Sequence, residues 1–227
     1  MTLVIAHRGA SKAFTENTIE AFAAAADMGA DWVELDVRHT ACGNIVVHHD
    51  PVTADGKLIR EQKLSGLPDH ISTLEAVIDA CGDMGINIEI KNDPSEDDYD
   101  PEHLMVPAIV KIARAKLSRD KTLITSFDMG AVNAVHDIDP NMPTGFLTMD
   151  DLGPEVSIGR ASAHAHVAIN PWDEIVTPRW ISVAQEAELH VYVWTVDDPK
   201  RMKELAEMGV DGIITNVPDV AVKALKR

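Results

Sequence analysis

Three carboxylates stand inside apolar runs of this sequence. Glu34 and Asp36 interrupt residues 32–37, and Glu89 interrupts residues 86–91, just before Lys91. Each run has the composition of a β-strand, in which residues two apart point to the same face. Acidic groups directed into a packed interior are costly unless a cation meets them. Oxygen ligands with a lysine nearby favour one divalent cation, Mg²⁺ or Ca²⁺, over zinc. Structural salt bridges on half-exposed strands are the alternative.

The elements that must position these carboxylates alternate between strand and helix. Strand patterns cover residues 3–7, 32–39, 45–49, 86–91, 122–126, 144–148, 166–170, 191–196 and 212–215. Helical patterns cover residues 18–28, 72–81, 104–115, 130–137, 178–188, 199–208 and 219–225, and residues 157–164 are poorly defined. Repeated strand-then-helix units imply parallel strands joined by right-handed crossovers.

The number of these units indicates the fold class. About eight are present, with one extra strand, 45–49, inserted after the second barrel strand. We therefore expect an α/β protein with a (β/α)₈ TIM barrel, formed by residues 1–227 as a single domain. A doubly wound open sheet is the alternative, but no glycine-rich phosphate loop of the dinucleotide-binding or Walker type occurs.

Polar residues gather where the predicted strands end. In a parallel barrel these ends meet on one face, which is the face that carries active sites. Apolar residues precede each of them, so packing alone explains the common position poorly. The residues concerned are His7, Glu34, Asp36, His49, Glu89, Lys91, Ser126, Trp194 and Asn216.

The composition argues against two classes of binding partner, nucleic acids and membranes. The net charge of −17 argues against binding nucleic acid or an anionic membrane. No stretch of about 20 apolar residues is present to span a bilayer, and the strand at residues 3–7 leaves no room for a secretory signal. We therefore expect a cytoplasmic protein without stable membrane association. The oligomeric state stays open.

Several charged or polar residues near these strands have a less certain role. The acid-rich residues 93–102 are interpreted as an exposed loop, with a lid or a second cation site as alternatives. Arg38 shares the face of Glu34 and Asp36 and is expected to form an ion pair near them. Asn17 fits the N-cap of the first helix. Glu16 either favours that helix N-terminus or contacts the site.

Taken together, the motifs resemble those of the glycerophosphodiester phosphodiesterase family. The resemblance extends from about residue 4 to residue 218 and is weak in the middle third. It rests on the combination of motifs, since no single tripeptide would suffice. The motifs that carry the resemblance are His7-Arg8-Gly9, Glu16-Asn17-Thr18, Glu34-x-Asp36, His48-His49-Asp50-Pro51, Glu89-x-Lys91, Ser126-Phe127, Trp194-Thr195 and residues 209–215.

The resemblance implies a (β/α)₈ barrel that hydrolyses glycerophosphodiesters to glycerol 3-phosphate and an alcohol. It further implies a role for each matching residue. Glu34, Asp36 and Glu89 would hold the metal, and His7 and His49 would form the acid/base pair. Arg8 and Lys91 would contact phosphate, with Trp194 lining the glycerol or leaving-group side. Glu16, Ser126 and Asn216 are expected in supporting positions.

Two departures from the family pattern concern the edges of the site. Asn216 stands where many members carry an aspartate, which we expect to alter a loop contact only. The Arg-Thr-Thr run that commonly follows His-Asp is absent after Asp50. We therefore expect a thinner pocket on the leaving-group side, and the sequence does not identify the alcohol.

The chemistry can also be argued without the family. A divalent cation together with Arg8 and Lys91 would reverse the negative charge of three carboxylates and suit a phosphodiester anion. Two imidazoles titrate near neutrality and can take opposite roles. We assign His7 as the acid and His49 as the base. A metal-dependent isomerase or aldolase acting on a sugar phosphate, and a non-catalytic phosphate-binding barrel, are the alternatives.

Overall fold

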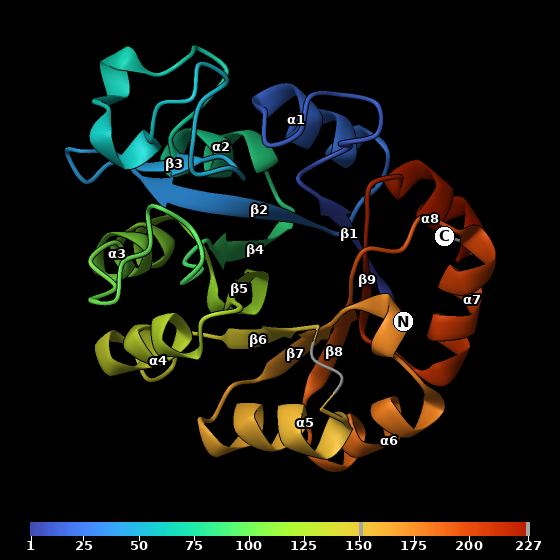
Figure 1. The fold of residues 1–227 in the computed structure, drawn as a ribbon. Helices are drawn as coiled ribbons and strands as arrows, with labels where there is room; N and C mark the ends of the chain where they lie inside the picture. The colour runs from blue at the N-terminus through green and yellow to red at the C-terminus, as the bar shows by residue number, and fades with distance from the viewer. Residues whose placement is uncertain (150–151, 226–227) are drawn as a thin grey trace.

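Parallel strands form the centre of the molecule (Figure 1). The computed structural model describes residues 1–149 and 152–225. The strands are β1 (Leu3–His7), β2 (Trp32–His39), β3 (Ile45–Val47), β4 (Gly85–Ile90), β5 (Thr122–Ser126), β6 (Thr144–Thr148), β7 (Ala168–Pro171), β8 (His190–Val193) and β9 (Gly212–Thr215). Within the described residues, these nine strands form one sheet.

The sheet closes into a barrel. Its order is β1-β9-β8-β7-β6-β5-β4-β2-β3, and an additional pairing of β1 with β2 joins the two sides. All barrel pairs are parallel, whereas β3 lies antiparallel on β2, with Val37 opposite Val47. The predicted (β/α)₈ barrel with one inserted strand is therefore confirmed.

Helices surround the strands as an outer ring (Figure 1). They are α1 (Ile19–Asp27), α2 (Leu74–Cys81), α3 (Val106–Lys116), α4 (Met129–Ile138), α5 (Pro154–Ala163), α6 (Pro178–Glu186), α7 (Pro199–Met208) and α8 (Pro218–Ala224). Short 3₁₀ turns occur in the connections. No helix in the described part of the chain has the length and apolarity needed to cross a bilayer.

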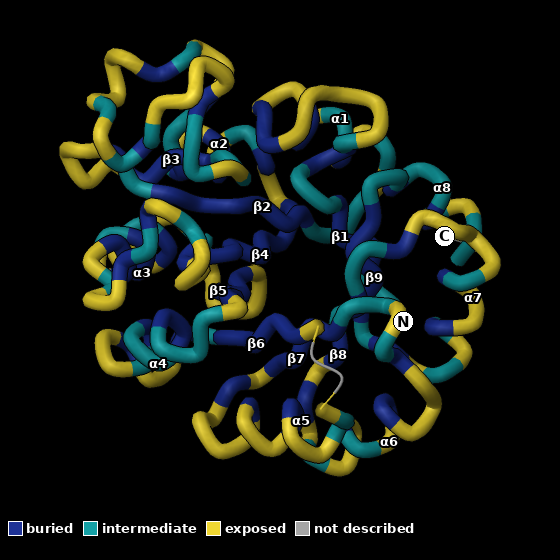
Figure 2. Tube along the Cα trace, in the orientation of Figure 1, coloured by how far each residue is buried: buried dark blue, intermediate teal, exposed yellow. Residues whose placement is uncertain are grey.

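The hydrophobic core lies between the strands and the helices. Figure 2 shows buried strands and helices whose outer faces are exposed. One large cluster includes Phe22 of α1 and side chains of α2, α3 and α4. A second includes Trp180 of α6 and side chains of α5, α7 and α8. These clusters hold the barrel strands in fixed register.

The strand register brings the acidic residues together. Asp36 of β2 lies opposite Glu89 of β4, and Glu34 of β2 lies opposite His7 of β1. His7 is the last residue of β1 and Glu89 is the fifth of six in β4, whereas Glu34 is only the third of eight in β2, earlier in its strand than expected. The register nevertheless aligns the polar side chains of the three strands at one end of the barrel.

Three local predictions differ from the structure. Strand β3 ends at Val47, so His48 and His49 lie beyond it, although the sequence predicts a strand through residue 49. The segment around residues 157–164 is helix α5, which begins at Pro154. Thr18 caps α1, because its hydroxyl accepts from Ala21 N, whereas Asn17 makes other contacts.

The acid-rich segment 93–102 is only partly the exposed loop that its charge predicts. Asp98 and Asp100 are 7% and 8% exposed. Asn92 bonds to Asp100 in both directions, donating from Nδ2 to the backbone oxygen at 3.0 Å and accepting from the backbone nitrogen at 2.8 Å. These bonds fold the segment back onto the end of β4, which composition alone does not indicate.

Candidate active site

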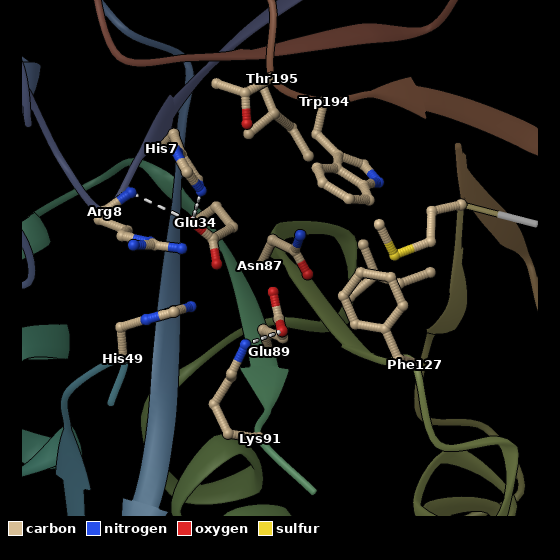
Figure 3. Close-up of a pocket in the computed structure, with 13 residues that line it drawn as sticks. His7, Arg8, Glu34, His49, Asn87, Glu89, Lys91, Phe127, Trp194 and Thr195 are labelled. Carbon is tan, nitrogen blue, oxygen red and sulfur yellow. Dashed lines mark hydrogen bonds and ion pairs between the residues drawn. The ribbon is translucent and has the colours of Figure 1, made fainter. Parts of the chain in front are cut away.

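A hollow of about 290 Å³ opens among the carboxyl ends of the barrel strands. Figure 3 shows imidazole, cationic and acidic side chains on one side of it and aromatic rings on the other. The predicted catalytic, metal and phosphate residues all line it except Asp36, which is buried against Arg8 and Lys91. The lining residues are His7, Arg8, Glu34, His49, Asn87, Glu89, Lys91, Phe127, Leu147, Met149, Trp194, Thr195 and Ile214.

The three carboxylates converge. Glu34, Asp36 and Glu89 each offer an oxygen, and these atoms lie within 4.8 Å of one another. The residues are 3%, 0% and 8% exposed. Glu34 Oε1 and Asp36 Oδ1 are buried and accept no hydrogen bond from a described residue. Buried acceptors without partners are costly, so these orphaned oxygens fit a bound divalent cation.

The pKa values of the three carboxyl groups are shifted because the groups are buried close together. Burial, followed by the negative charges of Asp36 and Glu89, raises the pKa of Glu34 well above its usual value. Burial is also the main cause of the raised pKa of Glu89. At Asp36 burial acts in the same direction, but the charges of Arg8 and Lys91 outweigh it, so its pKa is lowered. A cation would allow all three to ionise together.

Arg8 and Lys91 supply positive charge on either side of Asp36. Arg8 Nε lies 3.1 Å from Asp36 Oδ2, and Lys91 Nζ lies 2.9 Å from Glu89 Oε1 and 3.9 Å from Asp36 Oδ1. Arg8 adopts a left-handed backbone, with φ at 55°. Both cations line the hollow, so each can contact an anion there without leaving its carboxylate.

His7 is held by Asn216. Asn216 Nδ2 donates to Asp197 Oδ2 at 2.8 Å, which leaves Asn216 Oδ1 as an acceptor for His7 Nδ1 at 2.7 Å. The proton of neutral His7 therefore sits on Nδ1, and Nε2 lies 3.8 Å from Glu34 Oε2. Burial, aided by the charge of Arg8, lowers the pKa of His7.

His49 lies on the segment after β3. Its Nδ1 donates to Asp50 Oδ1 at 2.7 Å, and its ring lines the same hollow as His7 (Figure 3). A neighbouring carboxylate orients an imidazole by accepting a hydrogen bond from one ring nitrogen, which leaves the other nitrogen for chemistry. The two histidines therefore meet different partners, which is what an acid/base pair requires.

An apolar wall faces the charged side of the hollow. The rings of Phe127 and Trp194 meet edge to face, with centroids 5.5 Å apart. Trp194 Nε1 donates to the backbone oxygen of Asn170 at 2.8 Å, which fixes the indole. Leu147, Met149 and Ile214 extend the wall. It offers packing to the carbon atoms of a bound ligand.

The three predicted supporting residues have different surroundings. Glu16 Oε1 accepts from Arg8 Nη1 at 3.0 Å. Asn216 holds His7, so the expectation that this position affects a loop contact only is wrong. Ser126 instead joins strand ends, because its hydroxyl donates to the backbone oxygen of Ile90 at 2.8 Å and accepts from Asp128 N at 3.0 Å.

Sequence reasoning missed two asparagines of the site. Asn17 Nδ2 donates to Asp36 Oδ2 at 2.8 Å. Asn87 lines the hollow opposite Glu34 in the strand register, and its Oδ1 accepts from Thr125 Oγ1 at 2.9 Å. The position of Asn87, two residues before Glu89 and hence on the same strand face, is the signal that could have found it. For Asn17 the signal was its place in the motif Glu16-Asn17-Thr18, which was interpreted only as a helix cap.

Comparisons with known proteins identify the family of the chain. Residues 7–220 match the sequence model of the Glycerophosphoryl diester phosphodiesterase family. A glycerophosphodiester phosphodiesterase of Caldanaerobacter subterraneus subsp. tengcongensis is 29% identical over 253 residues, which covers 100% of this chain and 98% of that protein.

Solved structures share the fold. A glycerophosphodiester phosphodiesterase from Parabacteroides distasonis superposes with a TM-score of 0.86 at 26% identity, covering 99% of this chain and 97% of the other. An Oleispira antarctica phosphodiesterase in complex with the product sn-glycerol-3-phosphate gives a TM-score of 0.88 at 23% identity, covering 100% and 98%. By the match of the family model, the chain belongs to the glycerophosphoryl diester phosphodiesterase family.

Proposed function

We propose that residues 1–227 act as one catalytic domain that hydrolyses glycerophosphodiesters to glycerol 3-phosphate and an alcohol, with a divalent metal ion. The observation that carries this proposal is the convergence of three buried carboxylates beside two imidazoles and two cations. Membership of the family supports it, as does the glycerol 3-phosphate bound by the structurally similar Oleispira antarctica protein.

In this proposal Glu34, Asp36 and Glu89 hold Mg²⁺ or Ca²⁺. A metal bound there would polarise a phosphoryl oxygen and stabilise the charge that gathers in the transition state. The two orphaned oxygens of Glu34 and Asp36 support this role. Neither the charge of the ion nor its ligand type distinguishes Mg²⁺ from Ca²⁺ here, because both accept carboxylate oxygens.

Arg8 and Lys91 would bind the phosphodiester anion. Arg8 already pairs with Asp36, and Lys91 with Glu89. Their positive charges can therefore attract the substrate fully only when a metal ion has neutralised these carboxylates. With that cation, the local charge becomes positive within a chain whose net charge is −17. This reversal makes anion binding favourable.

His7 and His49 would move the protons. One imidazole takes a proton from the nucleophile, and the other gives a proton to the leaving oxygen. We assign the acid to His7, because Asn216 holds its Nδ1 and its Nε2, 3.8 Å from Glu34 Oε2, is the ring nitrogen that faces the metal carboxylates. We assign the base to His49, whose bond to Asp50 fixes the orientation of the ring.

The leaving alcohol or the glycerol would lie against Trp194 and Phe127. Their rings offer carbon surface rather than hydrogen bonds, so they position the substrate by packing. Turnover is tested by ³¹P NMR with glycerophosphocholine and either Mg²⁺ or Ca²⁺. We expect the diester resonance to give way to that of glycerol 3-phosphate and EDTA to stop the change. A persistent diester resonance with both ions would refute the activity.

A further inference from the structure

Arg38 is a charged side chain that the reaction described above does not use. It belongs to β2, two residues beyond Asp36, and lies opposite Val46 of β3. Its exposed fraction is 0%, and it is among the largest fully buried side chains. A buried guanidinium is costly unless its donors are all met, so its partners show what it holds together.

The guanidinium bridges two segments. Nε and Nη2 donate to the backbone oxygen of His49 at 2.8 and 2.6 Å. Nη1 donates to Asp98 Oδ2 at 2.7 Å, and Nη2 lies 2.9 Å from Glu96 Oε2. One side chain therefore connects the segment that carries His49 with the acid-rich segment after β4.

The acidic partners are themselves anchored. Asn92 pairs with Asp100 through both of its amide atoms and also donates to Asp128 Oδ2 at 2.7 Å. Asp100 accepts in turn from the backbone nitrogens of Glu102 and Leu104. Asp98 and Glu96 thus belong to a segment that is hydrogen-bonded to the barrel. Because Arg38 binds both this segment and the carbonyl of His49, it restrains His49 relative to the barrel.

We propose that Arg38, with Asp98 and Glu96, is a positioning unit that fixes the His49 imidazole relative to the metal carboxylates. His49 lies outside any strand, so β3 does not hold its backbone. The bonds from Arg38 to its carbonyl provide that restraint. A lysine would keep the charge but could not bridge the carbonyl and both carboxylates at once. The proposal rests on the hydrolase function proposed above.

The test compares Arg38→Lys and Asp98→Asn with the matched control Asp97→Asn. Asp97 is exposed in the same segment and makes no hydrogen bond or ion pair with a described residue. We expect both site-directed variants to lose about tenfold to a hundredfold in kcat with glycerophosphocholine, because displaced catalytic groups lose rate steeply. KM and the Mg²⁺ affinity should change less than twofold, and Asp97→Asn should match the wild type.

A second readout separates this role from general structural support. In ¹H–¹⁵N spectra of protein labelled at histidine, the ring signals of His49 should shift in Arg38→Lys and Asp98→Asn, while those of His7 stay in place. Unchanged His49 signals, or an equal loss of kcat in Asp97→Asn, would overturn the positioning role. Should Arg38→Lys fail to fold, Asp98→Asn and Glu96→Gln decide the matter. The spectra remain decisive even if the wild type hydrolyses no glycerophosphodiester.

Discussion

Asp36 is the side chain on which the contacts of the site converge. The positive groups of Arg8 and Lys91 lie on two sides of its carboxylate, and Asn17 donates a hydrogen bond to the oxygen that faces Arg8. Its other oxygen is buried and accepts no hydrogen bond from a described residue. A carboxylate held this firmly keeps its charge and its direction, which prepares it to coordinate a cation.

The assignment of the two histidines predicts opposite responses to the leaving group. An alcohol needs a proton to leave, whereas p-nitrophenolate does not. With glycerol 3-phosphate esterified to p-nitrophenol, His7→Gln should therefore recover most of the rate that it loses with glycerophosphocholine, and His49→Gln should recover none. Steady-state kinetics with the two substrates measures this. Recovery in His49→Gln alone would reverse the assignment, and recovery in neither would refute a dedicated acid.

Asn17 is expected to raise the metal affinity without contacting the ion, because it orients the predicted metal ligand Asp36. Its φ is 58°, so Asn17→Gly removes the bond to Asp36 while keeping the left-handed backbone that glycine adopts freely. We expect the Mg²⁺ affinity measured by calorimetry to fall by about tenfold to a hundredfold, as for other residues that orient metal ligands. A dissociation constant equal to that of the wild type would show that Asp36 needs no such support.

At the scale of elements, the loop between β1 and α1 is the tightest part of the site. Gly9 follows Arg8 with φ at 80°, and a Cβ added there would lie 2.6 Å from the backbone carbon of Ala21 in α1. The glycine therefore allows α1 to pack close to the end of β1. That contact fixes where Arg8 and His7 emerge from the barrel.

Replacement of Gly9 tests this close approach. Gly9→Ala should lower the free energy of unfolding by at least about 2 kcal/mol, because backbone must shift as well as adopt a strained φ. Gly56→Ala is the matched control, since Gly56 has φ at 79° with nothing within 4 Å of an added Cβ, and it should lose only about 1 kcal/mol. Equal losses in chemical denaturation would refute the steric argument.

The sequence predicted most elements because their patterns are local. Alternation in residues 32–39 and 86–91 placed the carboxylates correctly, and the structure shows both strands. The end of β3 was missed, since His48 and His49 continue an apolar run without a turn residue. The bonds of Asn17 and Arg38 were not predictable in detail, because they join segments distant in sequence through side-chain geometry that composition does not encode.

At the scale of the whole molecule, the two ends of the barrel differ in chemistry. The site occupies the carboxyl ends, whereas His166 lies just before β7, at the opposite end. His166 is 4% exposed, and its Nδ1 shares the Thr144 hydroxyl with His136. Burial, then the charges of His136 and His164, lowers the pKa of His166 to about 4 from a usual 6.5.

This buried imidazole predicts a loss of stability in mild acid. Between pH 6.5 and 4 the unfolded ring binds a proton that the folded ring does not, so stability falls as the pH falls through that window. The contribution is about 2 kcal/mol between pH 7 and pH 5. His166→Gln should therefore flatten the pH dependence of unfolding in urea, whereas His70→Gln, at an exposed ring outside this cluster, should not. An unchanged slope in His166→Gln would contradict this.

Calorimetric titration with Mg²⁺ or Ca²⁺ shows whether Glu34, Asp36 and Glu89 hold one divalent cation. We predict a single site per chain for at least one ion. Its affinity should fall at least about a hundredfold in Asp36→Asn and in Glu89→Gln, and stay unchanged in Asp97→Asn. Binding of equal strength in the wild type and both site variants, or no binding of either ion to the wild type, would contradict the account.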